Sequence, residues 1–231
     1  MPKTEIEKIL FIDIESVPVN YKYEELDKTS KELWDKKWHF NKEVTPEKHY
    51  DKAGIYAEFA KVVCIGVGFY NGKKFRIKSF TSENELEILK QFSELLAQHF
   101  NTANHLLCAH NGKEFDFPFL CRRFLINNLP LPKMLQIQGL RPWEVKHIDT
   151  LDLWKFGDVK NFSSLNLLAH VLGIPSPKDD MDGSLVSKTF YEEKNLKKIE
   201  TYCKKDVITL ARVYNRFAGT GNLNEEDIIF V

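Results

Sequence analysis

The sequence lacks an excess of charge of either sign: Lys plus Arg and Asp plus Glu number 33 each. Without a global positive field, the chain is a poor candidate for tight, non-specific binding to duplex nucleic acid. Long apolar runs, internal repeats and low-complexity linkers are also missing, and the charged start of the chain resembles neither a signal peptide nor a membrane span. We therefore expect a cytoplasmic protein that has no membrane partner.

Cysteine is scarce, with Cys64, Cys108, Cys121 and Cys203 as its four occurrences, and no two of them form a C-x-x-C pair. No histidine pattern typical of zinc sites accompanies them. These absences argue against structural zinc and against a disulfide framework. We expect reduced thiols, most of them buried.

What remains is the composition of an ordinary globular protein, and we predict one domain over residues 1–231. Short β-favouring apolar runs predict five strands. These runs cover residues 9–12, 62–69, 75–80, 106–109 and 145–148. The turn Asn71-Gly72 predicts a hairpin, so the first three strands form a meander.

Helical spacing of apolar residues predicts the helices that flank these strands. One helix begins with a capping box formed by Ser82 and Glu85, and three more cover residues 116–127, 164–171 and 195–217. Strands first, then alternating helices and strands, predict an α/β fold with a five-stranded mixed sheet flanked by helices.

Residues 19–52 interrupt this pattern after the first strand, and we interpret them as an inserted, partly helical lobe. The segment is rich in lysine and carries Tyr21, Tyr23, Trp34 and Trp38. Such a mixture suits contacts to single-stranded nucleic acid, and it equally suits a helix pair that covers the sheet. For the tryptophans, packing is the favoured interpretation.

Two acidic motifs follow predicted strands. Asp13 and Glu15 are separated by one residue, so on an extended backbone both carboxylates project to the same side. Their mutual repulsion calls for a counter-charge, which a hard divalent cation with oxygen ligands supplies. The segment from Asn111 through Phe115 to Asp116 begins where the strand 106–109 ends. Taken alone, Asp116 is better explained as a helix N-cap.

A third motif lies on the last predicted helix, where Tyr202 and Asp206 are four residues apart and therefore share one face. Both are near the apolar stripe of that helix, and a carboxylate in that position needs a partner. A lysine salt bridge for Asp206 and core packing for Tyr202 are the simpler alternatives.

Together the patterns D-x-E, N-x3-F-D and Y-x3-D, in this order, resemble the three exonuclease motifs of the DEDD superfamily in its tyrosine-bearing subgroup. The nearest resemblance is to stand-alone bacterial proteins related to the proofreading exonuclease domain of family-B DNA polymerases. It extends from Phe11 to about Phe217.

This resemblance implies a ribonuclease H-like fold and a 3′–5′ exonuclease that releases nucleoside 5′-monophosphates from single-stranded nucleic acid. It implies two divalent metal ions, Mg²⁺ or Mn²⁺, with Asp13, Glu15, Asp116 and Asp206 as metal ligands. Tyr202 would align the attacking water, since a phenol with a pKa near 10 suits orientation better than general-base work. DNA is favoured over RNA as the substrate.

Several positions are left with two interpretations. Val17 and Phe115 are candidates to contact the terminal base by their position, and Asn111 either binds the substrate or braces its loop. Asp149 either adds to the acidic site or, the favoured interpretation, caps a helix.

Two other functions stay open. One is a catalytically silent nucleic-acid-binding domain, and the other is a hydrolase of RNA or short oligonucleotides that uses the same site. A partner polymerase or repair protein is a further hypothesis.

Overall fold

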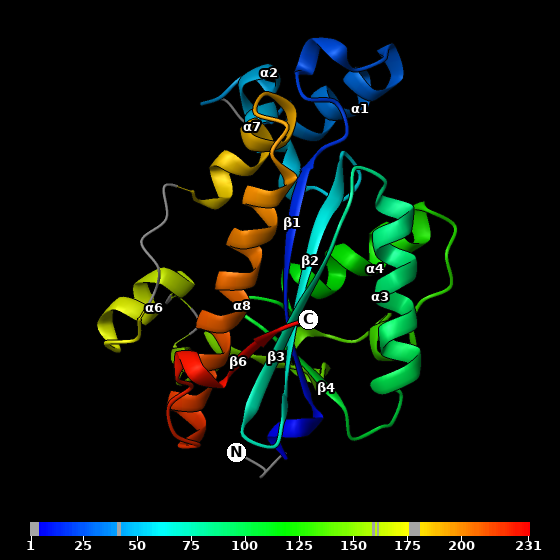
Figure 1. Ribbon diagram of the computed structural model, residues 1–231. Coiled ribbons are helices and arrows are strands. Elements are labelled where there is room, and N and C mark those ends of the chain that lie inside the picture. Colours follow the sequence, from blue (N-terminus) through cyan, green and yellow to red (C-terminus); the bar gives the residue numbers. More distant parts are fainter. Residues whose placement is uncertain (1–4, 41–42, 159, 161, 176–180) are drawn as a thin grey trace.

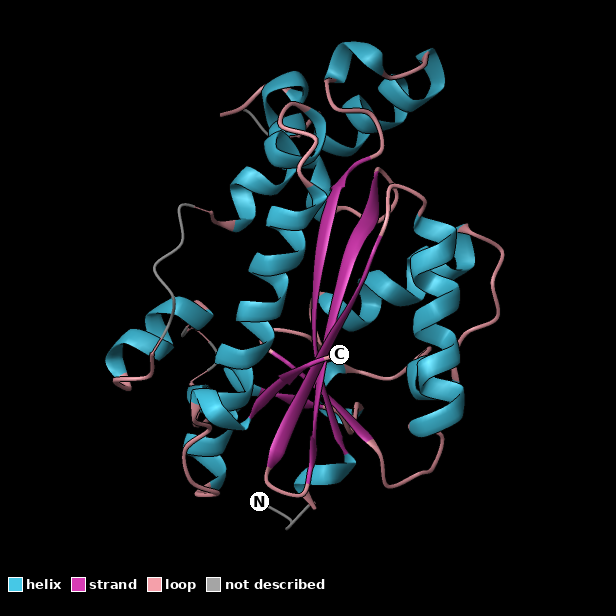
Figure 2. Ribbon diagram, in the orientation of Figure 1, coloured by secondary structure: helices cyan, strands magenta, loops and turns pink. Residues whose placement is uncertain are grey.

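The computed structural model describes residues 5–40, 43–158, 160, 162–175 and 181–231. Its centre is a mixed sheet with the strand order β5-β4-β1-β2-β3-β6 (Figure 2). The strands are β1 (Ile9–Pro18), β2 (Ala60–Asn71), β3 (Lys74–Thr81), β4 (Leu106–Ala109), β5 (Ile148–Asp149) and β6 (Ile228–Phe230). The helices are α1 (Lys28–Trp38), α2 (Pro46–His49), α3 (Glu85–His99), α4 (Asp116–Ile126), α5 (Thr150–Lys155), α6 (Leu165–Val171), α7 (Val186–Tyr191) and α8 (Leu196–Ala218).

The predicted meander is confirmed, because β2 pairs antiparallel with both β1 and β3. Strand β4 runs parallel to β1, and β5 runs parallel to β4. The sheet has one strand more than the five predicted, since β6 adds to the edge parallel to β3. This strand is three residues long and follows an acidic turn, so periodicity gave no signal for it.

Helices cover both faces of the sheet (Figure 1): α8 crosses one face, while α3 and α4 lie on the other. Strand β1 alternates between the two layers. Leu10, Ile12 and Ile14 pack with residues of α3 and α4, whereas Ile9 and Phe11 pack against α8. By the same alternation, the odd-numbered residues that follow along β1 face α8.

The ends of α8 agree with the sequence prediction. The Asn195 side chain caps the first turn by accepting a hydrogen bond from the Lys198 amide, and Gly219 ends the helix with a left-handed φ of 67°. The capping box predicted for α3 from Ser82 and Glu85 is wrong, because Asn84 caps that helix instead. Glu85 is buried and forms a two-point ion pair with Arg123, with N–O distances of 2.6 and 2.8 Å.

Two glycines of β2 allow α8 to lie directly on the sheet. A Cβ on Gly66 would come within 2.8 Å of Cys203 Sγ and 2.9 Å of Val207 Cγ2. A Cβ on Gly68 would come within 2.9 Å of Val207 Cγ1 on α8 and within 2.3 Å of the Phe75 ring on β3. Since real Cβ atoms do not approach so closely, any larger residue would force α8 or its side chains away.

Substitution of Gly66 by alanine should therefore lower the free energy of unfolding by about 1–3 kcal/mol, the usual cost of overpacking a filled core. Gly183→Ala is the matched control, because nothing lies within 4 Å of the Cβ that it would add. Denaturant unfolding of both variants measures the difference. Equal stability of the two would contradict the close approach.

The segment 19–52 contributes α1, α2 and the start of a 3₁₀ segment, Tyr50–Ile55. Trp34 is fully buried there with Leu26, Tyr50 and Ala53, so packing explains this tryptophan. Tyr21 stacks on Tyr191 of α7 at a ring distance of 4.8 Å. The lobe is thereby joined to α7 near the end of β1 (Figure 1).

Among the described residues, no helix combines the length and the apolar character needed to cross a membrane. All four cysteines are free thiols: Cys64, Cys108 and Cys203 are buried, and Cys121 is partly exposed.

Candidate active site

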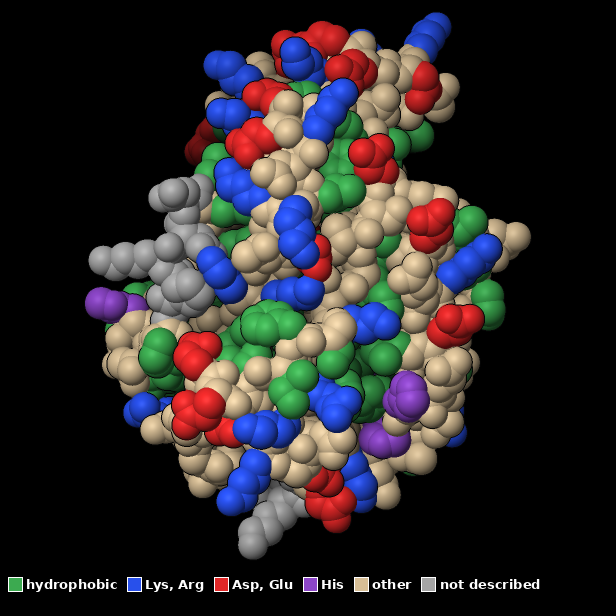
Figure 3. Space-filling view, in the orientation of Figure 1, with side chains coloured by type: hydrophobic (Ala, Val, Ile, Leu, Met, Phe, Trp, Pro, Cys, Tyr) green, Lys and Arg blue, Asp and Glu red, His purple; other side chains and the backbone are tan. Residues whose placement is uncertain are grey.

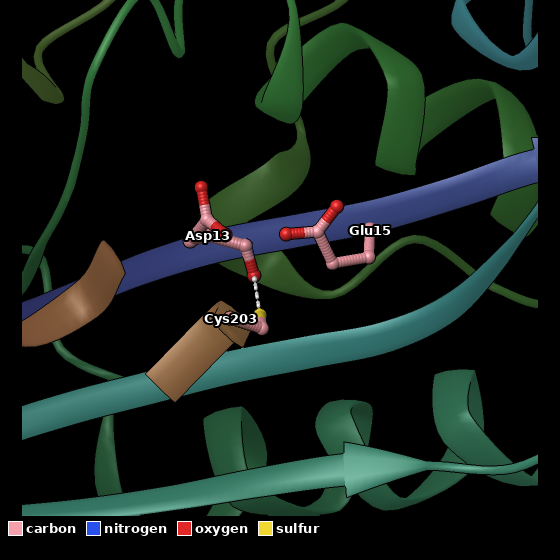
Figure 4. A group of neighbouring side chains, drawn as sticks. All are labelled: Asp13, Glu15 and Cys203. Atoms are coloured by element: carbon pink, nitrogen blue, oxygen red, sulfur yellow. Dashed lines mark hydrogen bonds between the residues drawn. The ribbon is translucent and has the colours of Figure 1, made fainter. Parts of the chain in front are cut away.

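The first two predicted site residues project from β1 toward α8. Figure 4 shows the carboxylates of Asp13 and Glu15 close to the side chain of Cys203 on α8. Cys203 Sγ donates a hydrogen bond to the backbone oxygen of Asp13 at 3.5 Å. Glu15 is buried, with 6% of its surface exposed, so its carboxylate has little contact with solvent to offset its charge.

Asp116 is the first residue of α4 and is buried. The turn before it is held by Asp149, whose carboxylate accepts hydrogen bonds from the amides of Asn111 at 2.8 Å and Lys113 at 3.0 Å. The same carboxylate caps α5 through the Leu151 amide at 2.9 Å, which confirms the predicted helix cap. Asp149 therefore positions the turn that carries Asp116.

Tyr202 and Asp206 are presented by consecutive turns of α8, and the two side chains are hydrogen-bonded to each other. Tyr202 packs at the edge of the apolar cluster under α7 and also lines an open cleft, so core packing accounts for only part of its surface. Burial first, and then the charges of Asp206, Glu15 and Asp13, raise the pKa of Tyr202 far above its ordinary value. The hydroxyl therefore stays protonated and acts as a hydrogen-bond donor.

Electrostatics shows that the four acids share one site. Burial raises the pKa of Asp13 well above its ordinary value, and the charges of Asp206 and Asp116 raise it further. The pKa of Glu15 is raised by burial, then by Asp13 and Asp206. Burial raises the pKa of Asp116 to about 7. Each group is destabilised as an anion first by burial and then by the charge of neighbouring acids, which for Asp116 is that of Asp149.

Such a site fits divalent cations. Within the described part of the chain, Asp13 Oδ2 is buried and has no hydrogen-bond partner, so one of its lone pairs faces the site unused. Possible ligand atoms of Asp13, Glu15 and Cys203 lie within 4.8 Å of one another. Burial raises the pKa of the Cys203 thiol, and hard cations select oxygen over sulfur, so the carboxylates are the ligands that fit Mg²⁺ or Mn²⁺.

The acids open into a cleft of about 470 Å³. Its walls come from five parts of the chain: β1, the 3₁₀ segment Tyr50–Ile55, the turn before α4, the start of α7 with the turn before it, and α8. The lining residues are Asp13, Ile14, Glu15, Ser16, Asp51, Lys52, Gly54, Ile55, Phe115, Gly183, Ser184, Ser187, Tyr202 and Asp206.

The three residues predicted to contact substrate have different positions in the structure. Phe115 lines the cleft, as its position in the sequence indicates. The prediction for Val17 is wrong, because α7 covers this end of β1 and leaves Val17 fully buried beside Val186 and Phe190. Asn111 lies in the turn with a left-handed φ of 61°, a conformation that asparagine tolerates. Its backbone braces the loop, and a contact to substrate stays a prediction.

Sequence reasoning missed most of the cleft walls. Lys52 and Ile55 reach the acids through the fold of the inserted lobe, and Ser184 and Ser187 do so through the packing of α7. None of these residues belongs to a motif with a fixed spacing. The lysine-rich composition of the lobe indicated only that this segment could contact single-stranded nucleic acid.

The mixed sheet flanked by helices, with acids grouped on its central strand β1, places the protein in the class of ribonuclease H-like α/β folds. A family model described as "Predicted 3'-5' exonuclease related to the exonuclease domain of PolB" matches residues 55–229. The match covers most of the chain, and the chain belongs to this family. Asp116, Tyr202 and Asp206 lie within the matched range, whereas the aspartate and glutamate on β1 precede it.

One solved structure with a similar fold is the family B DNA polymerase from the hyperthermophilic archaeon Pyrobaculum calidifontis. The TM-score is 0.59 at 15% sequence identity, and the similarity covers 90% of this chain and 24% of the polymerase chain. The predicted fold class is thereby confirmed. No curated protein sequence matches the chain.

The raised pKa values predict that the metal-free protein loses stability as the pH rises. The folded Asp116 carboxyl keeps its proton up to a pH of about 7, whereas the unfolded one loses it near its ordinary pKa of 3.8. The contribution of the protonated Asp116 carboxyl to folding stability is complete below the pKa of the unfolded state. It is lost as the pH rises toward the pKa of the folded state. In chelator, the melting temperature should fall between about pH 4 and pH 7, the interval between the two pKa values of Asp116, and Mg²⁺ should restore it most at pH 7 and above.

Scanning calorimetry of Asp116→Asn measures this effect, since the neutral amide should flatten the pH slope. Glu94→Gln is the matched control, because Glu94 is exposed on α3 and should leave the slope as in the wild type. An unchanged slope in Asp116→Asn would contradict the electrostatic assignment.

Proposed function

We propose that the protein is a two-metal-ion 3′–5′ exonuclease that hydrolyses single-stranded nucleic acid. The observation that carries the proposal is the convergence of Asp13, Glu15, Asp206 and the protonated Tyr202 in a single cleft. Asp116 is buried close enough for its charge to raise the pKa of Asp13 and of Glu15. The acids raise one another's pKa, and one buried carboxylate oxygen among the described residues lacks a partner. Membership in a family described as predicted 3′–5′ exonucleases supports the same activity.

In this proposal Asp13, Glu15, Asp116 and Asp206 hold the cations. Bound Mg²⁺ or Mn²⁺ supplies the positive charge that offsets the phosphate and acidifies a water molecule. The water oxygen forms a bond to the terminal phosphorus, and the bond between that phosphorus and the 3′-oxygen of the preceding nucleotide breaks. The shortened strand keeps a 3′-hydroxyl, and a nucleoside 5′-monophosphate leaves.

The chain's own side chains orient the reactants. The Tyr202 hydroxyl, which stays protonated and donates to Asp206, aligns the attacking water by accepting a hydrogen bond from it. Phe115 offers a ring at the cleft wall on which the terminal base stacks. The ring of Phe115 lies 5.4 Å from that of Phe119, which limits its movement.

We propose that the cleft receives a single strand, which passes the residues of the segment Tyr50–Ile55 and of the turn before α7 that line the cleft with the acids. We propose DNA as the preferred polymer, since the family is related to a DNA polymerase exonuclease domain. We further propose a cytoplasmic protein, with a partner polymerase or repair protein as the hypothesis for its pathway.

Degradation of 5′-labelled single-stranded DNA and RNA of matched sequence tests the activity. With Mg²⁺ or Mn²⁺ the products should form a ladder that shortens from the 3′ end, and chelator should abolish it. Asp206→Ala should reduce the rate by at least about a hundredfold, whereas Glu94→Gln should leave it unchanged. Absence of cleavage in both metals would overturn the proposal and leave the silent binding domain.

A dinucleotide and a long oligomer, compared in the same assay, separate the polymer exonuclease from the short-oligonucleotide hydrolase. Faster hydrolysis of the DNA oligomer supports the proposal. Exclusive hydrolysis of the dinucleotide, or a preference for RNA, favours the alternative.

Tyr202→Phe should lower kcat by about ten- to a hundredfold with little change in KM, because it removes only the hydroxyl that orients the water. The pH profile should keep its shape, since the phenol does not titrate in the working range. A profile that loses a limb near neutral pH would show instead that the tyrosine acts as a base.

A further inference from the structure

A second hollow, of about 410 Å³, adjoins the catalytic cleft on the outer side of α8. Tyr202 lines both depressions, so the two meet at this side chain. The remaining lining residues are Met181, Asn195, Lys197, Lys198, Thr201 and Lys205. Three of them are lysines, and none of the described residues that line the hollow is acidic.

The lysines of this hollow form a local positive surface on a chain whose net charge is zero. Figure 3 shows that Lys and Arg side chains gather over α8 on this face. Lys197 pairs with Glu200 at 2.9 Å, and Lys198 pairs with Glu193 at 3.1 Å. Both lysines reach solvent, where ion pairs contribute little, so a phosphate can replace the carboxylates.

The position of the lysines along α8 fits a strand whose 3′ end reaches the acids. Lys198 precedes Tyr202 by one helical turn, or about 6 Å along the axis at 1.5 Å per residue. In the proposed function the cations offset the terminal phosphate, and the phosphates further along the strand need positive charge from the protein. Lysines placed one turn away hold the next phosphates of the strand without touching the reacting one.

We infer that Lys197 and Lys198, named here the α8 lysine surface, bind the backbone phosphates of the single strand just upstream of its 3′ terminal nucleotide. This inference rests on the proposed function and adds to it the path that the substrate takes. The contacts are electrostatic, so they hold the strand without selecting its sequence. They give longer substrates an advantage over a dinucleotide, which ends before it reaches the surface.

Binding of a 5′-fluorescein oligodeoxythymidylate dodecamer with phosphorothioate linkages at its 3′ end tests the surface without hydrolysis. Lys197→Gln/Lys198→Gln should weaken binding at low salt by about five- to tenfold. The slope of log K against log salt should shrink by about 0.7 for each phosphate that the variant no longer neutralises. Lys197→Arg/Lys198→Arg keeps the charge and should bind as the wild type does.

Lys73→Gln/Lys90→Gln is the matched control, because these exposed lysines lie in the β2–β3 turn and on α3, away from the hollow. The second readout is the ratio of kcat/KM for an unmodified dodecamer to that for the dinucleotide. We expect this ratio to fall about fivefold in Lys197→Gln/Lys198→Gln and to stay constant in the control.

Wild-type affinity and an unchanged ratio in the α8 variant would overturn the inference, and so would an equal loss with both substrates, which indicates distortion of α8. A wild-type protein that hydrolyses nothing, yet binds the dodecamer through these lysines, would refute the exonuclease and support the surface. The two proposals therefore fail by different results.

Discussion

The close approach of α8 to β2 is the constraint on which the site depends. Gly66 lies opposite Asp13 in the sheet, and a Cβ at this position would collide with Cys203 and Val207 of α8. Because no side chain fills this space, the helix lies low enough for Tyr202 and Asp206 to meet the carboxylates of β1. A wider gap between helix and sheet would leave the acids on two separate surfaces.

This geometry concentrates negative charge in a place where water is scarce. Glu15 and Asp116 are buried, and the charge of each carboxylate is opposed by its acidic neighbours. A fold selected for stability alone would pair these anions, as it pairs buried Glu85 with Arg123. The two buried acidic sites therefore differ. Glu85 is neutralised within the protein, whereas in the proposed function the acids of the cleft would receive their counter-charge from bound cations.

Local signals in the sequence predicted much of this arrangement. The Asn195 cap and the Gly219 end fix the length of α8, and the four-residue spacing of Tyr202 and Asp206 then places both on one face. Predictions failed where distant packing decides. Val17 follows the alternation of β1 but is covered by α7, and Glu85 has the spacing of a capping box but pairs with Arg123. The cleft walls from the lobe also depend on tertiary contacts that no short motif encodes.

The proposed activity requires that acids from β1, α4 and α8 form one cation site. Calorimetric titration of Mn²⁺ into the wild type, Asp13→Asn, Asp116→Asn and Asp206→Asn tests this requirement most directly, with Glu94→Gln as the control. We expect two bound ions in the wild type and the control, and a weakened or lost ion in each of the three variants. Mn²⁺ binding that is the same in all five proteins would contradict a shared cation site.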